Sequence, residues 1–148
     1  MRKLLVAAAF AASMVMAAPA GAQEVAYTPG TYVVVQGIYI NDGQFENYMD
    51  YIAGQYRRQQ DFARSKGWIT GFRILANVNR RKDEPNLYLM TEVPRLPTPQ
   101  EEADRDRQME QALSQTARQA TEASGARVQM RTLGSNLLLQ ELTLRPSR

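Results

Sequence analysis

Three charged residues and two tyrosines are the strongest candidates for chemistry in this chain: Arg73, Glu92, Glu141, Tyr39 and Tyr88. The 148 residues include no cysteine and no histidine, so the chain offers no thiolate nucleophile, imidazole base or imidazole metal ligand. Ser-His-Asp catalysis, zinc hydrolysis and histidine-ligated haem are therefore excluded within it. Acid–base work would fall to carboxylates, tyrosines or the few lysines. We expect no cofactor and no metal.

The candidates are selected by the face of the sheet on which their predicted strands place them. If the strands 68–78 and 87–93 form an antiparallel hairpin that pairs Val78 with Leu87, Arg73 lies opposite Glu92. The other face of this hairpin is more apolar and should meet the helices. Alternation along 137–144 puts a further carboxylate on the mixed face, and two tyrosines could line it. The predicted ligand-binding candidates are Arg73, Glu92, Glu141, Tyr88 and Tyr39.

A cross-strand Arg–Glu pair has two interpretations, and the sequence leaves both open. Such a pair usually fixes strand register or contributes an ion pair to an interface. The alternative is that the Arg73 and Glu92 side chains bind or orient a ligand.

The elements that must position these residues follow a simple order. Residues 31–40 are rich in Tyr, Val and Ile on both alternating faces, which predicts a strand buried on both sides in the middle of a sheet. The expected order is then helix, strand, strand, helix, strand, with the final strand at 137–144. Between the second helix and that strand, we expect residues 124–134 to form a broken helix.

Capping signals mark the predicted helix ends. Asp42 is a suitable N-cap for the first helix, which carries an apolar stripe at spacings of three and four, and Gly67 is placed to end it. Thr98-Pro99-Gln100-Glu101 matches the capping box, with proline at the first helical position. The stripe of the second helix consists mostly of small residues and runs from Met109 to Ala120.

The N-terminus predicts the compartment. Arg2 and Lys3 precede an apolar run and the small-residue segment 18–22, the pattern of a secretory signal peptide. We expect residues 1–22 to be this signal, 23–30 a mobile N-terminal segment and 31–145 the folded domain. The mature protein would lie in the periplasm or be secreted, with no membrane segment after cleavage.

Charge argues against a nucleic-acid partner. Removing Arg2 and Lys3 leaves 16 of the 18 basic residues against 15 acidic residues. A balance so close to neutral lacks the basic surface that nucleic-acid binding requires.

The element order predicts an α+β fold: a ferredoxin-like β-α-β-β-α-β sandwich with a four-stranded antiparallel sheet and helices on one face. The other face would be left bare, so we expect a homodimer through the sheet face. The sequence resembles the dimeric α/β-barrel superfamily in the entry GIYINDGQFENYMDYI, the Gly67-Trp68 passage and the final LLLQELTL. This group includes antibiotic-biosynthesis monooxygenase-like domains and stress-responsive α/β-barrel proteins.

The resemblance implies a barrel of two sheets that encloses a ligand or substrate. It favours a protein that binds a small apolar or aromatic molecule, or one with a non-enzymatic role. Two alternatives remain: a cofactor-independent oxygenase acting on a quinol-like aromatic, and a structural stress-response protein with a filled interior. The haem-degrading members of the superfamily use a histidine that this chain lacks.

Overall fold

The computed structural model describes residues 25–146. The predicted signal peptide, residues 1–22, lies outside this range. Of the helices within 25–146, none is both long enough and apolar enough to cross a bilayer.

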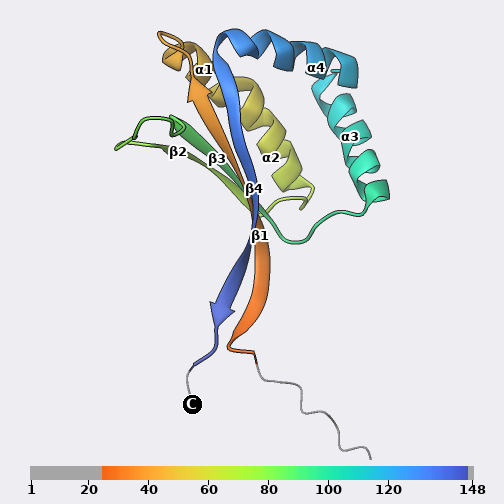
Figure 1. The fold of residues 1–148 in the computed structure, drawn as a ribbon. Helices are drawn as coiled ribbons and strands as arrows, with labels where there is room; N and C mark the ends of the chain where they lie inside the picture. Colours follow the sequence, from red (N-terminus) through yellow and green to blue (C-terminus); the bar gives the residue numbers. More distant parts are fainter. Residues whose placement is uncertain (1–24, 147–148) are drawn as a thin grey trace, which may run out of the picture.

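Four strands form one open antiparallel sheet in an α+β fold (Figure 1). The strand order is β2-β3-β1-β4, so β1 lies between β3 and β4. The elements in chain order are β1 (Tyr27–Ile40), α1 (Phe45–Tyr51), η1 (Ile52–Tyr56), α2 (Arg57–Ser65), β2 (Gly71–Ala76), β3 (Leu87–Val93), α3 (Pro99–Leu113), α4 (Ala117–Ala126), η2 (Arg127–Gln129) and β4 (Arg131–Leu144).

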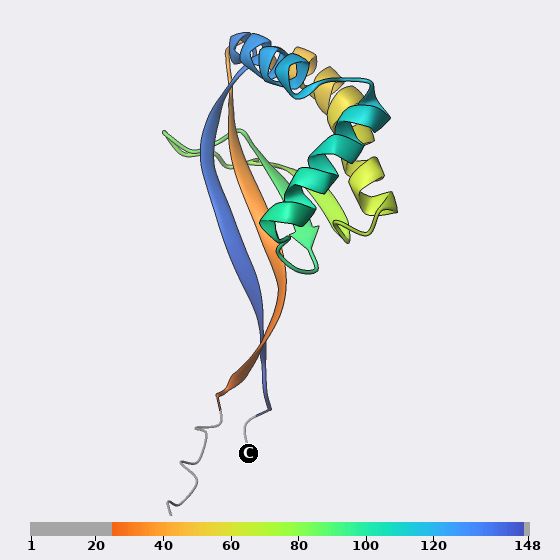
Figure 2. The same cartoon turned by 90° about the vertical axis from the view of Figure 1, so that its right-hand side faces the viewer.

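The helices cover one face of the sheet and leave the other face open (Figure 2). Both views show that β1 and β4 continue past the helix layer as a two-stranded ribbon. In this ribbon Tyr27 pairs with Leu144 and Thr28 with Thr143. The sheet therefore has one covered face, one open face and a projecting end.

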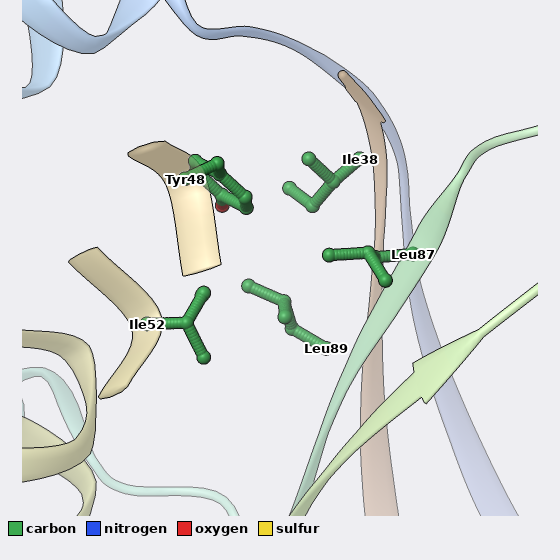
Figure 3. Packing of buried hydrophobic residues seen from close by; sticks show 5 residues of the cluster. All are labelled: Ile38, Tyr48, Ile52, Leu87 and Leu89. Carbon is green, nitrogen blue, oxygen red and sulfur yellow. The ribbon is translucent and has the colours of Figure 1, made fainter. Parts of the chain in front are cut away.

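The hydrophobic core lies between the sheet and the first helical segment (Figure 3). Ile38 of β1 and Leu87 of β3 are each only 1% exposed, and Leu89 lies beside them. Tyr48 and Ile52, one turn apart, meet them from the helix. Full burial of side chains of this size contributes about 1.5–3 kcal/mol each, so this cluster holds the helix on the sheet.

The first helical segment runs continuously from Phe45 to Ser65, with a π-helical turn, η1, in its middle. Gly67 ends it as predicted: its φ of 70° is left-handed, and the Trp68 amide donates to the Ala63 carbonyl at 3.0 Å. The predicted N-cap is wrong, because Gln44 occupies that position without a side-chain cap. Asp42 lies in the turn before it.

The second helix starts as predicted and ends earlier than predicted. Thr98 and Glu101 form both hydrogen bonds of the capping box, and Pro99 opens α3. The chain then breaks at Ser114, which adopts a left-handed conformation with φ 50°. A second capping box, from Thr116 to Gln119, starts α4. The prediction of one apolar stripe from Met109 to Ala120 missed this T-x-x-Q signal.

Two strands are longer than predicted because they pair with each other. β4 begins at Arg131, so the prediction of a broken helix over 124–134 is wrong for 131–134, although α4 and η2 do occupy 117–129. β1 begins at Tyr27, so residues 27–30, predicted as mobile, are part of the sheet. The pairs Ile40–Arg131 and Tyr27–Leu144 join residues more than 90 positions apart, a relation that local periodicity does not contain.

Candidate functional site

The open face of the sheet gathers the predicted candidates together with an apolar strip. Because Ile38, Leu87 and Leu89 point to the helices, strand alternation assigns their neighbours to the other face. The open-face residues are Val33, Val35, Gly37 and Tyr39 of β1, Tyr88, Met90 and Glu92 of β3, Gly71, Arg73 and Leu75 of β2, and Leu137, Leu139 and Glu141 of β4.

Large apolar side chains on this face remain in contact with solvent. Leu75 is 43% exposed, Leu137 46% and Leu139 49%. Val33 and Val35 lie opposite Leu139 and Leu137 and are half-buried between the two neighbouring strands. An extended apolar surface of this kind on a folded protomer is typical of a binding or association surface.

Arg73 and Glu92 form an ion pair on the open face. The predicted register is wrong by two residues, because Arg73 lies opposite Met90 and Gly71 lies opposite Glu92. The hairpin connection is longer than expected, since β2 ends at Ala76 rather than at residue 78. A shift of two residues keeps every side chain on its face, so the two charges meet diagonally.

Glu141 shares the open face and is separated from this ion pair. Its carboxylate lies beside Gly30, and the Thr31 hydroxyl donates to it at 3.5 Å. Since β1 lies between β3 and β4, the structure does not bring Glu141 to Glu92 or Arg73. The predicted group of three charged residues is thus two separate features, an ion pair toward one edge of the sheet and a carboxylate at the other.

Tyr39 and Tyr88 lie toward the end of the open face that the β2–β3 connection closes. The Tyr39 hydroxyl donates to the Asp83 carbonyl at 2.8 Å, and its ring covers Gly134, where a Cβ would lie 2.7 Å from the ring. Buried Pro85 approaches Gly37 so closely that a Cβ there would lie 2.8 Å from its Cγ. Tyr88 is the β3 partner of Gly37. Because Gly37 and Gly134 have no Cβ, Pro85 and the Tyr39 ring can pack against the sheet at this end of the open face.

A second polar cluster lies under the helices, and the sequence analysis missed it. Arg127 stacks on Tyr51 with its Cζ 4.3 Å from the ring centroid, and Arg131 lies 5.9 Å from the centroid of Tyr48. The two rings are 5.6 Å apart. Burial raises the pKa of Tyr48 to about 12, and the positive charges of Arg131 and Arg127 partly offset this effect. No motif marked these arginines: the sequence predicted a broken helix over 124–134, whereas Arg131 is the first residue of β4.

The contacts of Arg131 offset only part of the free-energy cost of burying its charge. Arg131 is only 7% exposed, and the buried Nε atoms of Arg127 and Arg131 have no hydrogen-bond partner among the described residues. The ion pairs found within 25–146 all use other arginines. A desolvated cation–π contact contributes about 2 kcal/mol, whereas burying a charge costs several kcal/mol. Stacking alone leaves the Arg131 charge under-compensated.

Acidic side chains are possible metal ligands. Residues 25–146 contain no group of three or more acidic side chains that could hold a metal ion.

Comparison with known proteins adds no relative. The sequence matches no family model, and neither the curated proteins nor the solved structures contain a significant match.

Proposed function

We propose that this chain is a secreted or periplasmic homodimer of ferredoxin-like protomers, an α/β barrel that holds a small apolar or aromatic molecule between two sheets. The element order β-α-β-β-α-β and the strand order β2-β3-β1-β4 support the protomer fold. The solvent-exposed strip of Leu75, Leu137 and Leu139 on the open face carries the proposal.

A second copy of the chain is the occupant that fits this face. The face carries few charges, the mutually paired Arg73 and Glu92 toward one edge and the Glu141 carboxylate at the other, so a two-fold related copy presents a mainly apolar strip. The apolar surface also reaches the outer strand, where Leu138 and Leu142 are exposed on the opposite side of β4. A barrel closed by two sheets would cover the open-face strip and leave Leu138 and Leu142 outside it.

Arginine substitution at Leu139 tests the dimer. Leu139→Arg places a charge in the proposed interface, and we expect the mature protein to change from a dimer to a monomer at micromolar concentration in sedimentation velocity. Leu96→Arg is the matched control, because Leu96 is similarly exposed, at 45%, and lies outside the sheet. A wild-type protein that sediments as a monomer would overturn the proposal.

The ligand is tested on protein purified from its native host. Native mass spectrometry followed by solvent extraction should detect an apolar or aromatic molecule bound to the wild type and absent from Leu139→Arg. A dimer whose extracts contain no such molecule would favour the alternative of a structural protein with a filled interior. Oxygen uptake with a panel of quinols, lost in Arg73→Ala, would instead indicate the oxygenase.

A further inference from the structure

The cluster of Tyr48, Tyr51, Arg127 and Arg131 has the properties of a binding site, and it lies on the covered side of the sheet. Arg127 belongs to η2 and Arg131 is the first residue of β4. The two guanidinium groups stack on neighbouring tyrosine rings whose centroids are 5.6 Å apart. Two like charges thus lie on one pair of neighbouring rings, Arg131 almost fully buried and Arg127 partly exposed.

Hydrogen bonds from Asn41 fix the backbone turn between the two arginines. The Asn41 side chain donates to the carbonyls of Val128 at 3.1 Å and Gln129 at 3.0 Å. The Asn41 backbone amide donates to the Met130 carbonyl at 3.0 Å. These three bonds hold the whole turn between the two arginines against the end of β1.

The unsatisfied groups of the cluster are donors. The buried Nε of Arg127 and that of Arg131 have no acceptor among residues 25–146. The Tyr48 hydroxyl is protonated at neutral pH, as the ordinary tyrosine pKa of about 10 already ensures, and burial raises that pKa further. Guanidinium donors beside a phenolic hydroxyl are complementary to an oxyanion, and arginine binds carboxylate and phosphate groups in a bidentate manner.

An open groove of about 750 Å³ is lined in part by sequence neighbours of this cluster. Its lining includes Ala126, which precedes Arg127, and Gln55, one helical turn after Tyr51. Gln115, Gln119, Glu122 and the exposed Arg58 also line it. Side-chain amides and one charge of each sign suit the polar body of a small molecule whose anionic group points to the arginines.

We propose that Arg127 and Arg131, stacked on Tyr51 and Tyr48, bind the carboxylate or phosphate group of a small polar ligand whose body lies toward the groove between η1 and the α3–α4 turn. This site is separate from the open face of the sheet. It does not depend on the dimer or on an apolar ligand.

The side-chain Nε–Hε resonances of arginine report on this site directly. ¹⁵N-labelled mature protein would be titrated with inorganic phosphate and, in a second arm, with benzoate, both at constant ionic strength set by sodium chloride. We expect saturable shifts of the Arg127 and Arg131 resonances in at least one arm. The arm that saturates at the lower concentration identifies the anion as phosphate or carboxylate.

Matched variants separate binding from general screening. Arg127→Gln should raise the dissociation constant at least about tenfold. Arg107→Gln, which removes an exposed arginine of α3 that pairs with Asp104 outside the groove lining, should leave it unchanged. Arg131→Met tests the buried member, and Arg127→Gln decides alone if that variant does not fold. Shifts that remain linear in both arms, or equal affinity in Arg127→Gln and the wild type, would overturn the proposal.

Discussion

Both faces of the sheet carry aliphatic side chains, and their surroundings differ. On the covered face, Ile38 and Leu87 are each 1% exposed beneath α1 and η1. On the open face, Leu137 and Leu139 retain 46% and 49% of their exposure. β1 supplies valines to both. Aliphatic residues on both sides of a strand therefore indicate two apolar surfaces, and only one of these is covered by helices within the protomer.

The largest expected effect compares one leucine from each face. Leu87→Ala removes a fully buried side chain and should lower the free energy of unfolding by about 2–5 kcal/mol, because a cavity adds to the lost transfer energy. Leu137→Ala should cost less than about 1 kcal/mol in the isolated protomer, since half of its surface already meets water. Urea unfolding at several protein concentrations measures both.

Concentration dependence sharpens this comparison. If the open face is buried in a dimer, the cost of Leu137→Ala should grow as protein concentration rises. Leu87→Ala should keep its cost in the protomer at every concentration. Equal, concentration-independent losses in both variants would contradict the distinction between the two faces.

An intermediate effect concerns Tyr48 on the covered face, whose pKa burial raises to about 12. Above about pH 10 the unfolded chain releases the phenolic proton while the folded chain retains it. The contribution is fully present below pH 10, and the free energy of unfolding should fall by up to roughly 2–3 kcal/mol as pH rises toward 12. Unfolding midpoints at pH 9 and pH 11 measure this fall.

Two phenylalanine variants isolate that contribution. Tyr48→Phe should show a smaller loss of stability between pH 9 and pH 11 than the wild type. Tyr27→Phe, at the exposed end of β1, should follow the wild type. Parallel profiles for the wild type and Tyr48→Phe would show that the hydroxyl does not remain protonated in the folded state.

Features of the fold that depend on a few neighbouring residues could be predicted from the sequence. Gly67 ends the first helix and Thr98 caps α3, because both depend on chemistry within one turn. The start of β4 at Arg131 could not be predicted, because the strand is set by pairing with Ile40 far away in the chain. Asp42 failed as a cap for a different reason: the chain turns at Asp42 and Gly43, and the helix begins two residues later.

In the candidate site too, local features could be predicted from the sequence and features that depend on distant pairing could not. The faces of Arg73 and Glu92 survived a register error of two residues, because alternation depends only on parity. The separation of Glu141 from them required the strand order, which local patterns do not give. The buried arginines were missed because their environment arises only when η2 and β4 fold against α1.

The smallest expected effect concerns the Arg73–Glu92 ion pair on the open face. Arg73 has a side chain that is 64% exposed, so a double-mutant cycle with Arg73→Ala and Glu92→Gln should give a coupling energy of about 0.2–1 kcal/mol in the monomer. Combining the cycle with Leu139→Arg, which should keep the chain monomeric, compares the pair with and without a second sheet above it. A coupling that rises above about 2 kcal/mol only in the dimer would show that the pair becomes desolvated there, because partial burial strengthens charge–charge interaction. Equal coupling in both states would mean that the pair stays exposed to solvent, at the mouth of the proposed barrel, where its role is to fix the β2–β3 register.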